Sequence, residues 1–145
     1  LPQNRAPKDA TFATWSDANN LTPSGTYLAG VTQMVVGAVG YSSSSTKTPR
    51  PGDLFTFDAA NSNHLKAYMV TRVETNNDYQ SGTTPPTSSQ VRLHFTPPLQ
   101  KSVVASDNLV FTNPLIRCIV NSNIQEYSLN TDNLYSFSLK LEEVQ

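Results

Sequence analysis

The stretch 50–99 constrains the fold most, because turn signals alternate there with short runs typical of strands. Pro51-Gly52-Asp53 is a turn signature, since proline presets φ for the first central position and glycine tolerates positive φ at the next. The runs 54–57 and 66–73 are rich in aromatic and β-branched residues, which favours strands. The run 90–96 alternates apolar and polar residues, the period of a strand with one buried face. These three runs predict a meander.

The rest of the chain has the same character. Further strands are predicted at 31–39, 109–111, 115–120, 124–129 and 134–144. No window has the apolar period of a helix. Roughly nine short strands at close spacing predict an all-β fold, an antiparallel sandwich or small barrel.

The chain divides into three predicted parts. Residues 1–30 contain prolines and mixed charges without a period, and are predicted to form an extended N-terminal arm or linker. Residues 31–120 are predicted to form a β-barrel-like module, and residues 121–145 contain the C-terminal strands. The single tryptophan, Trp15, is interpreted as a packing anchor or an interface residue, because tryptophan is enriched in both places.

Charge and cysteine content exclude several classes of partner. Charged residues are 14% of the chain and the net charge is −1, so a nucleic-acid partner is not expected. No apolar run reaches the roughly 18 residues of a membrane span, so none is expected. The lone Cys118 cannot form an intrachain disulfide, which indicates folding in a reducing cytoplasm. We interpret Cys118 as a packed structural thiol.

The sequence contains no constellation typical of catalysis, so we predict no enzyme activity and no cofactor or metal site. His64 and His94 lie far apart in sequence with no second ligand at metal-binding spacing, and we expect both to be ordinary surface or turn residues. Asp53 and Asp58 bracket a predicted strand at turn positions, where aspartate commonly caps backbone amides.

An alternative function is carbohydrate binding by a β-sandwich, either free or as part of a host-adsorption apparatus. Trp15, Tyr27, Tyr41 and Tyr79 lie in segments predicted as loops, where an aromatic ring can stack on a sugar.

An ordered set of motifs over 46–145 resembles the distal-tail or baseplate hub proteins of tailed bacteriophages. The motifs are the Pro51-Gly52-Asp53 turn and strand, Lys66-x-Tyr68-x-Val70-Thr71-x-Val73, Leu93-x-Phe95-x-Pro97-Pro98-Leu99, Leu109-Val110-Phe111, Gln125-Glu126-Tyr127-Ser128-Leu129-x-Thr131-Asp132-x-Leu134-Tyr135, and the amphipathic final strand.

The resemblance implies a non-enzymatic virion protein, made in the host cytoplasm, that forms a ring around the tail tube, often with six-fold symmetry. Its partners would be copies of itself and other tail proteins of the tube, hub or baseplate. The strands of 121–145 would join the ring-forming sheet. The candidate interface residues are Trp15, Tyr127, Leu129, Tyr135, Phe137, Leu139 and Leu141.

The start of the chain departs from that family, whose members usually carry additional strands ahead of the module. Two interpretations stay open. Either an N-terminal part is missing, or residues 1–30 act as an arm on a neighbouring subunit.

Overall fold

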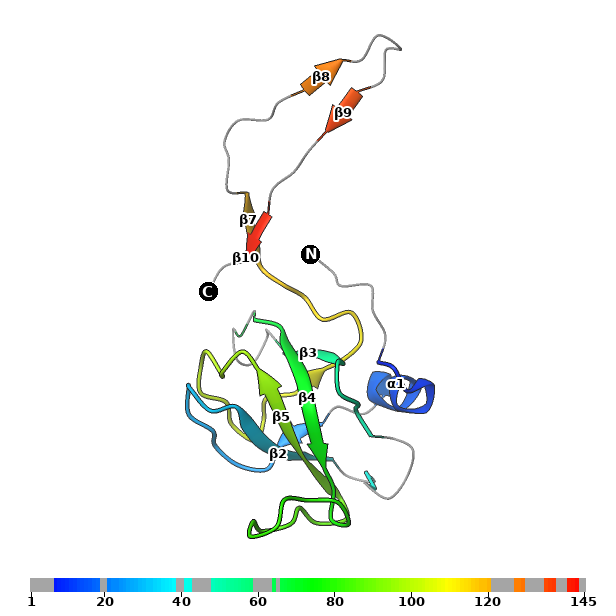
Figure 1. Cartoon of the computed structure of the whole chain (residues 1–145), viewed down its shortest axis with the longest axis vertical. Coiled ribbons are helices and arrows are strands. Elements are labelled where there is room, and N and C mark those ends of the chain that lie inside the picture. The colour runs from blue at the N-terminus through cyan, green and yellow to red at the C-terminus, as the bar shows by residue number, and fades with distance from the viewer. Residues whose placement is uncertain are drawn as a thin grey trace.

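The protein is an all-β chain with a barrel and a narrow two-stranded extension (Figure 1). The computed structural model describes residues 7–18, 21–38, 41–42, 48–58, 64, 66–120, 127–129, 135–137 and 141–143. The described residues form ten strands and one helix of nine residues, which confirms the predicted all-β class. The elements are α1 (Ala10–Ala18), β1 (Thr22–Pro23), β2 (Gln33–Gly37), β3 (Leu54–Phe57), β4 (Tyr68–Glu74), β5 (Gln90–Thr96), β6 (Leu109–Val110), β7 (Cys118–Val120), β8 (Tyr127–Leu129), β9 (Tyr135–Phe137) and β10 (Leu141–Glu143).

Six strands form one antiparallel sheet that curls into a nearly closed barrel. The strand order is β1-β2-β5-β4-β3-β6. An isolated bridge between Leu21, just before β1, and Leu109 on β6 links the two ends of the sheet, and Leu109 N donates to Leu21 O at 2.8 Å. The two end strands of the sheet are therefore joined to each other, which protects edges that would otherwise attract other strands.

The turn before β3 has the form predicted from its sequence. Asp53 N donates to Arg50 O at 3.0 Å, which closes a four-residue turn. Gly52 occupies the third position with φ 90°, a conformation that glycine adopts without steric cost. The turn delivers the chain into β3 at Leu54.

A β-bulge in β4 determines which side chains face outward beyond it. Val70 pairs with Phe95 and Arg72 pairs with His94, so Thr71 is an extra residue without a register partner on β5. Because one extra residue reverses the alternation of a strand, Val73 faces the core opposite Leu93, whereas Arg72 and Glu74 face outward.

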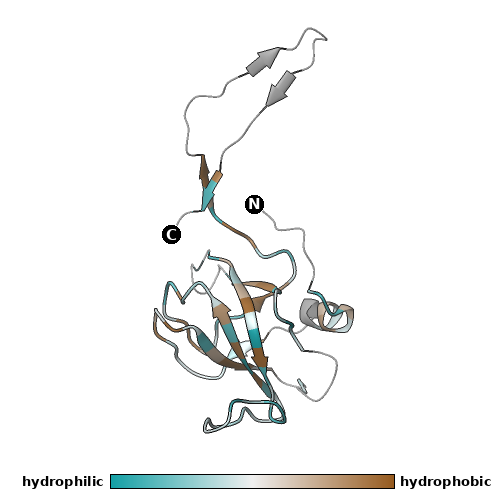
Figure 2. Ribbon diagram, in the orientation of Figure 1, coloured by the Kyte–Doolittle hydropathy of each residue, from teal (hydrophilic) through white to brown (hydrophobic). Residues whose placement is uncertain are grey.

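Aromatic rings fill the barrel. Phe55 lies at the centre, with its ring centroid 5.4–5.8 Å from those of Phe57, Tyr68, Phe95 and Phe111. In Figure 2, brown hydrophobic segments recur along the strands of the barrel. The buried apolar residues are Phe12, Leu21, Met34, Val36, Tyr41, Phe55, Phe57, Tyr68, Val70, Val91, Leu93, Phe95, Leu99, Val103, Leu109 and Phe111.

The helix α1 was not predicted. The stretch 1–30, predicted to form an extended arm or linker, contains α1, β1 and two buried core residues, Phe12 and Leu21. Asp9 caps the helix, since its Oδ1 accepts from Thr11 N and Phe12 N, both at 3.0 Å. Phe12 is completely buried, and its ring meets that of Phe111 edge-on at 5.0 Å. A short helix with one deeply buried ring gives too few apolar positions for a visible helical period.

The C-terminal strands form two antiparallel pairs, one beyond the other, which we call the ribbon (β7–β10). β7 pairs with β10 next to the barrel, and β8 pairs with β9 further out (Figure 1). Of the strand predicted over 134–144, the structure describes β9 and β10, whereas residues 134, 138–140 and 144 lie outside the described part. The ribbon begins after the segment 111–117, which connects it to β6.

Candidate functional site

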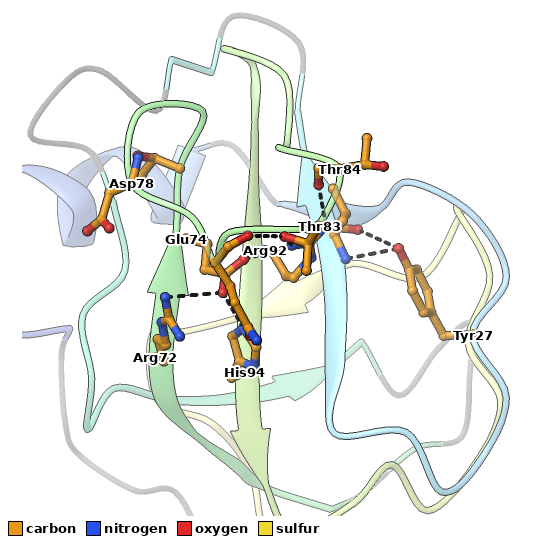
Figure 3. A network of polar contacts seen from close by, with 11 residues as sticks. Tyr27, Arg72, Glu74, Asp78, Thr83, Thr84, Arg92 and His94 are labelled. Carbon is orange, nitrogen blue, oxygen red and sulfur yellow. Dashed lines mark hydrogen bonds and ion pairs between the residues drawn. The ribbon is translucent and has the colours of Figure 1, made fainter.

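The bulge in β4 brings four polar side chains together on the outer wall of the barrel. Glu74 pairs with Arg92 across β4 and β5, and Arg72 pairs with His94. The four side chains therefore lie next to one another on one face of the sheet, and we call them the Glu74 cluster (Figure 3).

Glu74 is the centre of this cluster. Its side chain is 1% exposed, and its Oε2 accepts from Arg92 Nη1 at 2.7 Å. Its Oε1 lies 3.1 Å from His94 Nε2 and 3.4 Å from Arg72 Nη2. Both carboxylate oxygens thus have partners, as a buried charge requires.

Arg92 extends the cluster to the long loop 75–89 between β4 and β5. Its Nη1 also donates to Thr83 Oγ1 at 3.2 Å, and its Nη2 donates to Thr84 O at 2.6 Å. One guanidinium group therefore ties the loop to the buried carboxylate of Glu74 (Figure 3).

The electrostatics of the cluster favour an ionised Glu74. Burial opposes ionisation, but hydrogen bonds from Arg92 and His94 and the charges of His94 and Arg72 outweigh it, so the pKa of Glu74 is lowered. A carboxylate held in this state accepts hydrogen bonds and does not donate a proton near neutral pH. The arrangement suits a clamp between strands and loop better than acid–base chemistry.

A groove of about 500 Å³ runs beside the cluster, between Tyr27 and Arg92. Residues of β2 and of the segment just before it line the groove between these two side chains. Tyr27 Oη accepts from Val35 N at 2.9 Å, which ties its ring to the barrel wall. The groove has one charged lining residue, Arg92, whose guanidinium is already engaged with Glu74 and the loop.

A second polar group lies inside the barrel near the ribbon. His64 Nε2 hydrogen-bonds to Tyr68 Oη, which also accepts from Gln100 N at 3.0 Å. Burial lowers the pKa of His64 to about 4 and raises that of Tyr68 to about 12. The expectation that His64 is an ordinary turn residue was wrong, since its side chain is 1% exposed. His94, expected on the wet face, is partly exposed as predicted, but belongs to the Glu74 cluster.

The two aspartates that bracket β3 are placed by backbone hydrogen bonds. Asp53 is buried, and its carboxylate accepts from Arg50 N at 2.8 Å and Lys8 N at 2.9 Å. This confirms the capping interpretation for Asp53. Asp58 N donates to Asn108 O at 2.9 Å, which continues the pairing between the end of β3 and β6.

The aromatic residues proposed as a sugar platform do not share one surface. Tyr41 is 4% exposed in the core. Trp15 is half-buried, with its ring 5.2 Å from that of Tyr41 and 6.2 Å from that of Phe12. Tyr27 lies against β2, and Tyr79 is exposed in the loop 75–89. Trp15 therefore acts as a packing residue on the side of α1.

Four of the predicted interface residues become two register pairs. On β8 and β9, Tyr127 pairs with Phe137 and Leu129 pairs with Tyr135. Leu141 is on β10, opposite Val120, and Leu139 lies outside the described residues. Pairing within one chain is thus enough to account for the alternation of large apolar residues at these positions.

The ribbon exposes apolar side chains. Figure 2 shows β7 as hydrophobic along its length. The exposed fractions, on the ribbon and the segment leading to it, are 55% for Leu115, 52% for Ile119, 49% for Val120 and 36% for Leu141. Cys118, expected to be packed, is half-buried at the base of β7. The sequence predicted a strand here but did not indicate that it leaves the barrel.

Within the described residues, no group of three or more His, Cys, Asp or Glu side chains is arranged to hold a metal ion. The helical part of the described chain is too short to cross a bilayer.

Comparison with known proteins found no family model that matches this chain and no curated protein that matches it.

Proposed function

We propose that this protein is a structural subunit of a bacteriophage tail, of the distal-tail or baseplate hub kind, which assembles into a ring at the tail tube. The observation that carries the proposal is the contrast between the barrel and the ribbon. The ends of the barrel sheet are joined through the Leu21–Leu109 bridge, whereas the ribbon leaves the barrel as a two-stranded sheet.

A two-stranded ribbon is a poor structure for an isolated subunit. Two strands alone are marginally stable in water, because each has one row of unpaired backbone groups and neither face is covered. Ile119, Val120 and Leu141 add apolar surface exposed to solvent. A neighbouring strand and a covering surface would satisfy both needs.

A second copy of the chain is the partner that we favour. Copies related by rotation about an axis along the ribbon place β10 of one copy beside β7 of the next. These strands run in opposite directions, as β7 and β10 do within one copy, so antiparallel pairing can continue around a ring. The net charge of −1 opposes close packing of copies only weakly.

The resemblance of the motifs over 46–145 to tail proteins is the basis for locating the proposed ring in a phage tail. By that resemblance the partners are the tail tube, the hub or the baseplate, and the protein resides in the virion tail after synthesis in the host cytoplasm. A hexamer is the symmetry that the resemblance favours.

The test is the oligomeric state of the purified chain, by mass photometry and negative-stain imaging. We expect a ring with a central channel, and we expect Val120→Lys and Leu141→Lys to shift the chain to monomer. The matched control is Tyr79→Lys, because Tyr79 is 41% exposed in the loop 75–89, which lies at the opposite end of β4 from Lys66 and the ribbon (Figure 1). A chain that stays monomeric at every concentration, and is absent from tailed particles, would overturn the proposal.

A further inference from the structure

The base of the ribbon is joined to the barrel by an ion pair between residues far apart in sequence. Lys66 Nζ, just before β4, donates to Glu143 Oε2 on β10 at 2.6 Å. The Lys66 side chain is 11% exposed and that of Glu143 is 31% exposed. The pair is therefore partly shielded from water, where an ion pair is stronger and more dependent on geometry than at the surface.

The surroundings of the pair make Glu143 depend on Lys66. Glu143 Oε1 is buried and has no hydrogen-bond partner among the described residues, so the carboxylate depends on the bond that Lys66 donates to its Oε2. The Tyr68 hydroxyl is close enough that the charge of Glu143 contributes to its raised pKa. A polar contact of this kind fixes direction, because it is lost when the two groups turn away from each other.

The chain segment that leads from the barrel to the ribbon borders a cavity on one side. The segment 111–117 contributes Asn113 and Leu115 to the wall of a cavity of about 270 Å³, whose other walls include Phe57, His64 and Val110. Leu115 is 55% exposed. Apolar packing along this side of the connection is therefore incomplete, and it leaves the direction of the ribbon to be set by other contacts.

We propose that the Lys66–Glu143 pair is a latch that sets the angle of the ribbon against the barrel and thereby regulates ring assembly. Its consequence for assembly rests on the proposed function, but the latch itself is a property of one subunit. With the latch closed, the free edges of β7 and β10 are presented in one direction, so association requires less ordering of the subunit. With the latch broken, the ribbon samples several directions and association becomes weaker.

The test measures the distance between ribbon and barrel in the full chain. Spin labels are attached to Ile119→Cys and Met69→Cys in a Cys118→Ser background, and labelled chain is diluted with unlabelled chain so that distances within one subunit dominate. We expect a narrow distance distribution with the latch intact. Lys66→Met and Glu143→Gln should broaden or shift it. The double variant Lys66→Glu with Glu143→Lys should restore it, because the pair is re-formed with reversed charges.

The matched control is Arg50→Met, which removes an ion pair of 2.8 Å with Asp9 next to α1 that includes no ribbon residue. We expect it to leave the distance distribution unchanged. An unchanged distribution in both Lys66→Met and Glu143→Gln would overturn the latch.

Assembly is measured separately on unlabelled variants without the cysteine changes. We expect Lys66→Met to weaken ring formation about tenfold, since truncating one partner of a shielded charge pair leaves the other unsatisfied. A distribution that broadens while ring formation is unchanged would overturn the regulatory role. A chain that never forms rings, yet whose distance distribution responds to Lys66→Met, would overturn the proposed function and leave the latch standing.

Discussion

Glu74 on β4 lies directly opposite Arg92 on β5, and Arg92 Nη1 donates a hydrogen bond of 2.7 Å to the buried carboxylate. Arg92→Met should therefore lower the free energy of unfolding by about 2–4 kcal/mol, because it leaves a buried charge with fewer partners. Replacing both residues by leucine should cost less than Arg92→Met alone, since no buried charge remains. Urea unfolding of the single and double variants measures this difference. Equal losses in the two variants would show that packing, not charge pairing, dominates.

The same carboxylate predicts a dependence of stability on acid pH. The pKa of Glu74 is lower in the folded than in the unfolded chain, so its ionisation stabilises the fold above the unfolded pKa. That contribution is lost as pH falls through the lowered folded pKa. Glu74→Gln should thus be less stable than the native chain at pH 7, and the difference should shrink below about pH 4. Denaturant unfolding at several pH values tests this convergence.

His64 predicts a loss of stability over a higher pH range. Burial lowers its pKa from 6.5 to about 4, so the unfolded chain binds a proton that the folded chain excludes between these values. Stability should fall as pH drops through this window, by on the order of 3 kcal/mol. His64→Gln keeps a group able to bond with Tyr68 and should flatten this part of the profile. A profile that keeps its slope in the variant would assign the effect to other groups.

Phe55 is the ring on which the barrel core depends most. Its contacts with four other aromatic rings predict that Phe55→Ala lowers the free energy of unfolding by about 3–5 kcal/mol. Met69→Ala, on the outer face of the neighbouring strand, should change it by less than about 0.5 kcal/mol. Chemical unfolding of both variants supplies the measurement. If both variants lost a similar free energy of unfolding, Phe55 would not be the centre of the core.

Asp53 joins the turn before β3 to the segment ahead of α1. Asp53→Ala should cost about 2 kcal/mol, because Arg50 N and Lys8 N both lose their acceptor. The amide hydrogens of these two residues should also exchange faster with solvent, which NMR measures residue by residue. Tyr79 and the other residues of the loop 75–89 provide amides away from the turn for comparison.

Five of the six barrel strands, β2 to β6, could be predicted because their signals are local, whereas β1 lies in the stretch 1–30 expected to be an arm or linker. The Pro51-Gly52-Asp53 turn and the alternation over 90–96 each depend on neighbouring residues alone. The buried faces of β3 and β5 follow directly from them. The helix α1 escaped prediction because its stability depends on Phe12 packing against Phe111, a contact between distant parts of the chain.

The Glu74 cluster could be predicted only in part. Alternation places Arg92 and His94 on one outer face, but nothing in the sequence of β4 marks Thr71 as an extra residue. Likewise, the burial of His64 depends on Tyr68 and Phe57, which the fold brings around it. The pairing of Lys66 with Glu143 joins residues 77 positions apart and has no local signal.

The unpaired residue Thr71 decides which side chains at the end of β4 meet the apolar interior and which meet water. If Thr71 were instead paired with His94 in a regular register, Arg72 would lie opposite Leu93 and Glu74 opposite Val91, so a cation and an anion would point into the apolar interior. Val73 would move to the wet side. One residue of irregular backbone thus keeps both sides of the wall compatible with their surroundings.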